Sequence, residues 1–174
     1  KGIVVIDNSA AWRFEDDIPL VVPEVNPQDI AKYKNRGIIA NPNCSTIQAV
    51  VALKPLADKY GLERVIYSTY QAVSGAGVRG FEDLKGGICG EPPQKFPYPI
   101  AGNCLPHIDV FFDDGYTKEE MKMIWETRKI MGLPDLRVTA TTVRVPVYYG
   151  HSESINVELK KPFEVDEVRA LLAS

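Results

Sequence analysis

The chain has 174 residues, 45% of them apolar and 25% charged, which is long enough for one filled core and ordinary for a globular protein. The formal net charge of −3 gives no indication of a nucleic-acid partner, and no run of Lys or Arg indicates an anionic membrane surface. No apolar stretch approaches the roughly 18 residues that a membrane span needs.

The sequence opens with a pattern that is typical of the interior of a sheet. The residues "GIVVID" (2–7) read as a buried strand of a parallel sheet, and they follow neither an initiating Met nor a signal-peptide pattern. We therefore expect the chain to be a fragment of a longer protein. Residues 9–25 read as irregular, after which Asn26 and Pro27 predict the N-cap and first residue of a short helix.

Strands and helices alternate through the first half of the chain, and two long strands follow. The predicted elements after the first helix are a short strand at 37–40, a helix at 45–60 ended by Gly61, a strand at 64–73, a glycine loop, a short helix near 78–85, a helix from Thr117 to Gly132 with a Thr117–Glu120 capping box, antiparallel strands at 136–150 and 153–160, and a last helix from 164. This order predicts an α/β protein in which the tail of a doubly wound, Rossmann-type domain precedes an α+β domain. We place the division between residues 1–42 and 43–174.

Cys44 lies at the junction of a strand and a helix, within "NPNCSTIQ" (41–48). Backbone N–H groups at the start of a helix have no intrahelical partner, and the macrodipole is positive there, so we expect the pKa of the Cys44 thiol to fall below about 8.5. The same groups could hold a developing oxyanion. The alternative is a buried, inert thiol, and this is the reading we give Cys89 and Cys104. Three cysteines with irregular spacing do not indicate disulfides, which favours a reducing cytoplasm.

The segment from Gly75 to Gly80 matches G-x-G-x-x-G, but its context argues against a dinucleotide fingerprint. That fingerprint requires a second parallel strand and an acidic residue about 20 positions on, whereas "LKGGICGEPPQKFPYP" (84–99) follows here. Two readings remain: a plain glycine turn, or a loop whose bare backbone lets a ligand approach closely.

Two residues near the end of the first long strand are candidates for chemistry. His151 titrates near neutrality and could serve a thiol as a base, although it could equally be structural. Arg144, flanked by valines, needs a partner, which is either a structural carboxylate or the carboxylate of a substrate. Their seven-residue offset sends them to opposite faces of a continuous strand, so they can converge only if the chain turns, and Gly150 is the expected place.

Four motifs, in this order, resemble those of the aspartate-β-semialdehyde dehydrogenase family: "NPNCSTIQ", "STYQAVSGAG" (68–77), "GYTKEEMK" (115–122) and "VRVPVYYGHSES" (143–154). The resemblance covers nearly the whole chain, and it implies that residues 43–174 form a catalytic and dimerisation domain of the glyceraldehyde-phosphate-dehydrogenase-like type. It also implies an NADP-dependent enzyme that interconverts aspartyl phosphate and aspartate semialdehyde on the route to lysine, threonine and methionine. The partners implied are the small-molecule substrate, phosphate and a second copy of the chain, with no metal.

The resemblance also implies roles for particular residues, which we take as expectations. Matched motif by motif, the expected roles are Cys44 as the nucleophile that forms an acyl-thioester, His151 as acid/base, Gln71, Glu119, Arg144 and Asn43 as substrate-binding residues, Lys122 as a phosphate ligand, and Ser74 and Gly75 as cofactor contacts. From spacing alone, Glu119 and Lys122 could instead be a solvated i,i+3 pair on a helix face.

The chain departs from the family pattern in what it does not contain. The N-terminal glycine-rich phosphate-binding turn, a second phosphate-binding arginine and the C-terminal helix of the family are missing, so we expect the isolated chain to be inactive and the cofactor site to lie mostly outside it. Two other readings stay open: a cysteine hydrolase or acyltransferase with a Cys44–His151 dyad, and a non-catalytic dimerisation module. The first requires a group that orients His151, and the second predicts equal reactivity for the three thiols.

Overall fold

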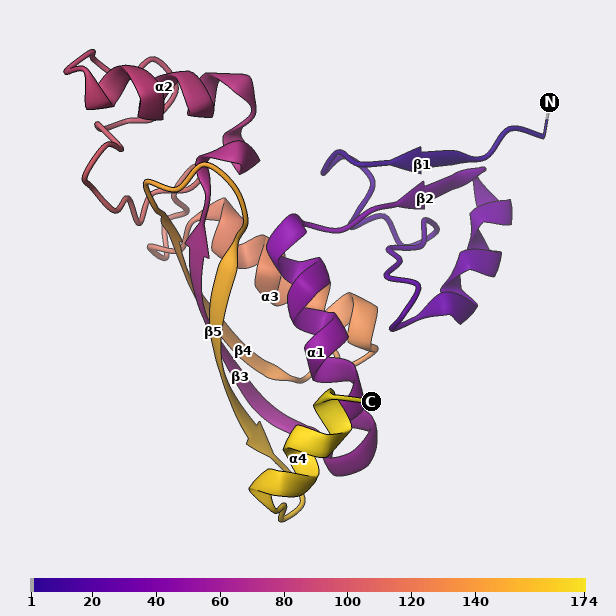
Figure 1. Ribbon diagram of the computed structural model, residues 1–174. Helices are drawn as coiled ribbons and strands as arrows, with labels where there is room; N and C mark the ends of the chain where they lie inside the picture. Colours follow the sequence, from indigo (N-terminus) through magenta and orange to yellow (C-terminus); the bar gives the residue numbers. More distant parts are fainter. Residues whose placement is uncertain (1) are drawn as a thin grey trace. The chain divides into compact units, whose positions relative to one another are not determined.

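The computed structural model describes residues 2–174 and confirms the α/β class (Figure 1). The chain forms two compact units, which we describe separately. Unit 1 contains the residues up to Val65, Lys122–Val138 and Val157–Ser174, and unit 2 contains Ile66–Met121 and Thr139–Asn156. Among the helices of residues 2–174, none combines the length and the apolar character that a membrane span requires.

A small parallel sheet begins unit 1. Strand β1 (Val5–Asp7) pairs with β2 (Ile38–Ala40), and the two run side by side in Figure 1. The prediction that the first strand is buried is wrong, since Ile6 is 74% exposed. The physical reason is that side chains of a parallel sheet are buried by elements packed on its faces, whereas β1 packs mainly on its neighbour β2.

The short helix of unit 1 forms where the sequence predicts it, with Asn26 in the N-cap position and Pro27 at the first helical position. It is a 3₁₀ helix, η1 (Pro27–Asn35), and the Asn26 side chain makes no cap bond to it. Instead, the Asn26 amide is buried, accepts from the backbone of Val22 and donates to the carbonyl of Leu20. Asn26 therefore ties together the irregular segment that precedes the helix.

The long helix α1 (Cys44–Tyr60) is confirmed, and it ends at Gly61, whose φ of 73° suits glycine. Its inner face joins a core with the irregular segment and α3 (Lys118–Met131). The buried members of this core are Ile18, Leu20, Val22, Val25, Ala40, Val50 and Ile130. This packing fixes the start of α1 against the C-terminal part of α3 within unit 1.

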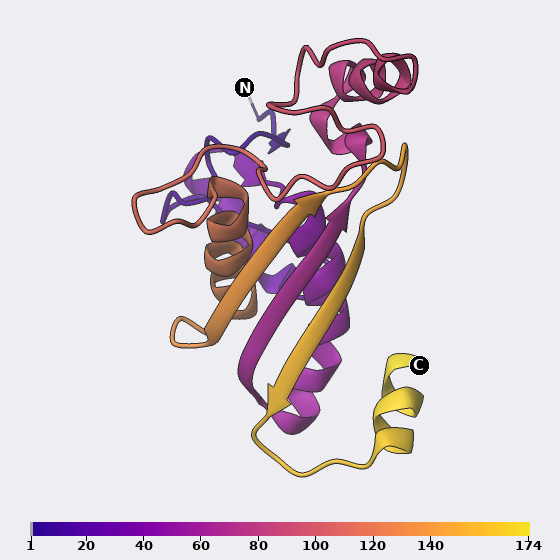
Figure 2. The same cartoon turned by 90° about the vertical axis from the view of Figure 1, so that its left-hand side faces the viewer.

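Three strands form the second sheet, in the order β4–β3–β5, as Figure 2 shows. They are β3 (Leu62–Gln71), β4 (Arg137–Arg144) and β5 (Ser152–Leu159). The prediction of a neighbouring pair made by the last two strands is wrong, because β3 lies between them. Sequence spacing misses this because adjacent strands in a chain need not be adjacent in a sheet.

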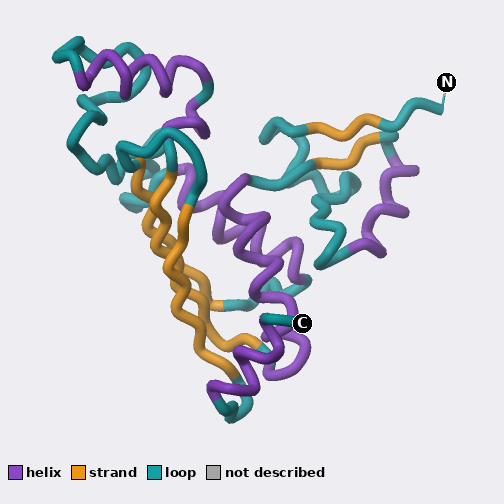
Figure 3. The backbone as a smooth tube through the Cα atoms, in the orientation of Figure 1, coloured by secondary structure: helices purple, strands orange, loops and turns teal. Residues whose placement is uncertain are grey.

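Unit 2 continues from β3 into a 3₁₀ turn, η2 (Val73–Ala76), and α2 (Val78–Ile88). Residues 89–117 then run mainly as loop, the long teal stretch in Figure 3. Asp83 on α2 anchors this loop: its carboxylate accepts the backbone N–H groups of Gln94, Lys95 and Phe96 at 2.7–2.8 Å. Burial by itself would raise the pKa of Asp83, but these bonds and the Lys95 charge together hold it below its ordinary value.

The capping box predicted for α3 is present in unit 2. The backbone N–H of Thr117 donates to Oε2 of Glu120 at 2.8 Å, and the N–H of Glu120 donates to Oγ1 of Thr117 at 3.3 Å. The Glu120 carboxylate also accepts the N–H of Thr142 on β4 at 3.0 Å. The last helix, α4 (Val165–Leu172), belongs to unit 1 and packs on α1.

Candidate active site

Most of the predicted site residues of unit 2 meet around the backbone of Ala72. Arg144 donates from Nη1 to the Ala72 carbonyl at 2.7 Å, and the Ala72 N–H donates to Nδ1 of His151 at 3.0 Å. The two side chains therefore converge despite their odd offset. The chain turns between β4 and β5, and Gly150 has a φ of 80°, as the sequence predicted.

Gly75 completes this cluster by having no side chain. A Cβ at Gly75 would lie 2.9 Å from Nη1 of Arg144 and 3.1 Å from Nε2 of His151, both closer than ordinary contact. The bare backbone predicted for the glycine loop is therefore required by the protein itself, because a side chain at Gly75 would collide with Arg144 and His151. Gly75 itself is exposed and Ser74 is half-buried, so both remain accessible to a ligand.

The hydrogen bond to Nδ1 fixes the form of the His151 imidazole. An acceptor at Nδ1 carries no hydrogen, so the neutral ring carries its hydrogen on Nε2. Burial lowers the pKa of His151, the Arg144 charge lowers it further, and Glu119 acts in the opposite direction. His151 is therefore held neutral, with an Nε2–H donor beside Gly75.

Gln71 and Glu119 form a second pair in unit 2. Gln71 is almost completely buried, and its Nε2 donates to Oε1 of Glu119 at 3.3 Å. Glu119 is only 6% exposed, so the alternative of a solvated helix-surface pair with Lys122 is wrong for this carboxylate. Lys122 belongs to unit 1 and is half-buried.

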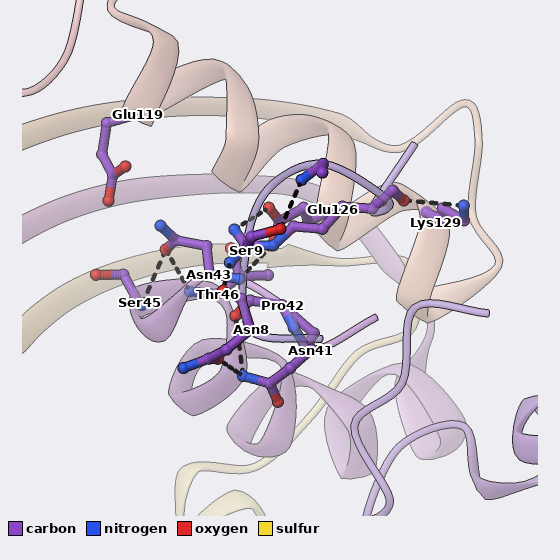
Figure 4. Close-up of polar contacts among 12 residues, drawn as sticks. Asn8, Ser9, Asn41, Pro42, Asn43, Ser45, Thr46, Glu119, Glu126 and Lys129 are labelled. Atoms are coloured by element: carbon purple, nitrogen blue, oxygen red, sulfur yellow. Dashed lines mark hydrogen bonds and ion pairs between the residues drawn. The ribbon is translucent and has the colours of Figure 1, made fainter. Parts of the chain in front are cut away.

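Cys44 is exposed and is the first residue of α1, as the sequence predicted. We expected the backbone N–H groups at the start of α1 to be available to a developing oxyanion, and this is wrong for two of them. The Oδ1 atom of Asn43 accepts from Ser45 N at 3.0 Å and from Thr46 N at 3.3 Å, and Figure 4 shows both bonds. Asn43 is thus the N-cap of α1, and its side-chain oxygen is used for capping. Contact between substrate and the amide nitrogen of Asn43 stays a prediction.

The other two cysteines differ from their expectation. Cys89 and Cys104 are free and exposed rather than buried. Exposure alone therefore does not distinguish Cys44, and what sets it apart is its place at a capped helix start.

Unit 1 contains a buried carboxylate that was not predicted from the sequence. Glu126 on α3 has no exposed surface, and its Oε2 accepts the backbone N–H of Asn43 at 2.6 Å. Its Oε1 pairs with Nη1 of Arg13 at 3.0 Å. In the sequence Glu126 reads as one more charge on an amphipathic helix, so no local signal could have found it.

An apolar hollow in unit 2 was also missed. Its volume is about 360 Å³, and it is lined by Val78, Phe81, Glu82, Lys85, Tyr148 and Tyr149. The ring of Phe81 stacks on Tyr148, with centroids 5.9 Å apart. Tyr148 and Tyr149 come from the same connection that carries His151.

Comparison with known proteins agrees with these motifs. Residues 53–174 match the model of the semialdehyde dehydrogenase dimerisation domain, and residues 1–33 match that of the semialdehyde dehydrogenase NAD-binding domain. The chain belongs to the semialdehyde dehydrogenase family. The aspartate-semialdehyde dehydrogenase of Aquifex aeolicus is 62% identical over 98% of this chain and 52% of the relative. The resemblance found in the motifs is therefore confirmed.

Solved structures give the same result for the fold. Aspartate semialdehyde dehydrogenase II of Vibrio cholerae, complexed with ASA, has a TM-score of 0.95 and 53% identity over 99% of this chain and 53% of that chain. The aspartate semialdehyde dehydrogenase of Candida albicans with NADP has a TM-score of 0.72 and 31% identity over 98% of this chain and 48% of that one. The chain spans about half the length of the relatives it matches. The domain division at residue 42 stays a prediction.

Proposed function

We propose that this chain carries the catalytic half of an aspartate-semialdehyde dehydrogenase, which reduces aspartyl phosphate to aspartate semialdehyde with NADPH and releases phosphate. The observation that carries the proposal is the convergence of Arg144 and His151 on Ala72, with Gly75 open beside them. A cation and a hydrogen-bond donor that meet at an exposed glycine suit an anionic acyl substrate. The names of the relatives support the same reaction.

The first step of the proposed reaction belongs to Cys44, the first residue of α1. Its thiolate attacks the acyl carbon of aspartyl phosphate, a C–S bond forms, and the C–O bond to phosphate breaks. The departing phosphate takes up one proton and is bound by Lys122. Arg144 holds the substrate carboxylate, while Gln71 and Glu119, bonded to each other, position the substrate from a buried and therefore rigid pair.

The chain's part in the second step is to hold the acyl group while it is reduced. When bound, the nicotinamide cofactor supplies a hydride to the acyl carbon. Ser74 and Gly75 suit contact with it, because both are accessible and neither presents a bulky side chain. Nε2–H of His151 donates to the oxygen that becomes negative, and collapse of the adduct returns the thiolate of Cys44. His151 can take up a proton only if Nδ1 releases the N–H of Ala72.

The same hydrogen bond argues against the cysteine hydrolase. In a Cys–His dyad, Nε2 must accept the thiol proton, so Nδ1 must carry a hydrogen and face an acceptor. Here Nδ1 faces the N–H donor of Ala72, which is the opposite arrangement. A hydrolase would therefore need the imidazole to turn over before it could act.

The test is phosphate-dependent reduction of NADP by aspartate semialdehyde, in a protein that joins this chain to a complete cofactor domain. Cys44→Ser should lower activity by at least about 10³-fold, whereas Cys89→Ser and Cys104→Ser, which remove thiols that are also exposed, should keep it within about twofold. Full activity of the Cys44→Ser protein would refute the proposal. Ester hydrolysis without cofactor would favour the hydrolase, and equal alkylation of the three thiols would favour the non-catalytic module.

A further inference from the structure

The start of α1 is held by an ion pair from outside the helix. Glu126 accepts the N–H of Asn43 at 2.6 Å, the distance of a strong charge-assisted bond, while the Asn43 side chain caps the N–H groups of Ser45 and Thr46 (Figure 4). Asn43 is therefore fixed at both its backbone and its side chain. Cys44 is the next residue, so its backbone position is fixed with it.

Burying the Glu126–Arg13 ion pair costs desolvation free energy, and the need to fill space in the core does not explain why charged side chains are used. Glu126 has no exposed surface and Arg13 is 7% exposed, and two charges removed from water are often no more stabilising than apolar side chains of the same volume. An uncharged acceptor could also satisfy one N–H group. The acceptor is instead a carboxylate, and Arg13 neutralises its charge. The Nη2 atom of Arg13 donates to the carbonyl of Asn8 at 3.1 Å.

The sign of the charge matters because Cys44 comes directly after Asn43 in the chain. A lone carboxylate next to Cys44 would oppose a thiolate, and a lone guanidinium would favour it. Two other charged groups around this segment bond elsewhere: Asp7 accepts from Ser9, and Lys129 donates to the carbonyls of Arg13, Glu15 and Ile18. Within unit 1, the Glu126–Arg13 pair contacts the residue before Cys44 through the Glu126 carboxylate.

We infer that Glu126 and Arg13 are positioning residues for the Cys44 nucleophile: Glu126 fixes the Asn43 amide, and Arg13 cancels the charge that would otherwise suppress the thiolate. The inference rests on the proposed role of Cys44. It makes a prediction that a purely structural pair does not, because removing either partner must move the Cys44 pKa, and the two removals must move it in opposite directions.

The experiment measures the pKa of Cys44 from the pH dependence of its alkylation by iodoacetamide, in the purified protein with Cys89→Ser and Cys104→Ser so that one thiol remains. Arg13→Gln leaves the carboxylate alone and should raise this pKa by about one unit, the lower end of the shift that a nearby uncompensated charge gives. Glu126→Gln keeps an oxygen acceptor for Asn43 but leaves the guanidinium alone, so it should lower the pKa by about one unit.

Matched controls and a double variant complete the design. Lys54→Gln and Asp58→Asn make the same two charge changes in an exposed pair of α1. Lys54 lies ten residues beyond Cys44, about 15 Å along the helix, so each control should move the pKa by less than about 0.3 units. The double variant Arg13→Gln/Glu126→Gln should return it to within about 0.3 units of the parent.

Shifts of the same sign in the two single variants, or shifts no larger than those of the controls, would overturn the inference. If one single variant does not fold because it buries an unpaired charge, the other single variant decides, by a shift of the expected sign that exceeds those of the controls. A double variant whose Cys44 pKa differs by a full unit from the parent overturns the inference. The proposed function is tested separately, by whether Cys44 in the parent reacts faster than Cys89 and Cys104.

Discussion

Replacing Gly75 by alanine places one methyl group between the two side chains of the cluster. The new Cβ would lie 2.9 Å from Nη1 of Arg144 and 3.1–3.2 Å from the ring of His151. Ordinary contact begins near 3.4 Å, so both groups must move by a few tenths of an ångström. Neither can move without loss, because each is hydrogen-bonded to Ala72.

The cost follows from what the two hydrogen bonds to Ala72 lose. A hydrogen bond to a charged group contributes about 1.5–3 kcal/mol and a neutral one about 0.5–1.5 kcal/mol, and weakening rather than breaking the bonds of Arg144 and His151 should forfeit about half of each. Gly-to-Ala replacement offsets about 0.4–1 kcal/mol of this by restricting the unfolded chain. We expect the free energy of unfolding to fall by about 1 kcal/mol. Activity should fall more, by about 10-fold in kcat/KM, because Arg144, the proposed substrate clamp, would be displaced by a few tenths of an ångström and would misplace the reacting carbon.

The assay is urea unfolding combined with kinetics of the protein that carries a complete cofactor domain. The matched comparison is a double-mutant cycle with Arg144→Ala, in which the methyl group no longer meets a guanidinium. There the additional cost of Gly75→Ala should drop below about 0.5 kcal/mol. An unchanged kcat/KM for Gly75→Ala, or the same cost with and without Arg144, would refute the reasoning.

Three further predictions concern unit 2. Arg144→Gln should raise the pKa of His151, measured by NMR titration of its ring protons, because burial and the Arg144 charge hold it low against the opposing charge of Glu119. Since the folded-state pKa of His151 is depressed, its contribution to stability is present above its ordinary pKa and lost as pH falls through the folded value, and Arg144→Gln should flatten that loss; an unchanged pKa would contradict this. Asp83→Asn should lower the free energy of unfolding by about 2 kcal/mol at pH 7, because an amide cannot accept all three N–H bonds, and the difference should shrink as pH falls through the low pKa of Asp83; a pH-independent difference would count against it. Thr117→Ala should cost about 1 kcal/mol in urea unfolding by removing the cap of α3, whereas Thr117→Ser should cost less than half as much; equal losses would show that the hydroxyl is not what matters.

The sequence patterns predicted those features that depend on residues close together in the chain. The caps and ends of the helices follow from a few neighbouring residues, as in the Thr117–Glu120 box and the Gly61 and Gly132 ends. The convergence of Arg144 and His151 was predictable as well, since it needed only strand parity and one glycine.

Long-range arrangements were not predictable from the same patterns. Nothing in the last two strands indicates that β3 lies between them. Glu126 shows the same limit, because its partners are 83 and 113 residues away in the chain. The Asn43 cap was foreseeable as a cap, but its consequence, that two amides expected to hold an anion are already bonded, required the coordinates.

The distance in sequence between Glu126 and Asn43 has a consequence for how the protein is made. During synthesis α1 leaves the ribosome well before α3 exists, so the first amide of the cap waits for its acceptor while some 80 residues are added. At about 5–20 residues per second this interval lasts several seconds. An exposed thiol at an unfinished helix end is open to oxidation throughout that time, so completion of the start of α1 is a late event that depends on the second half of the chain.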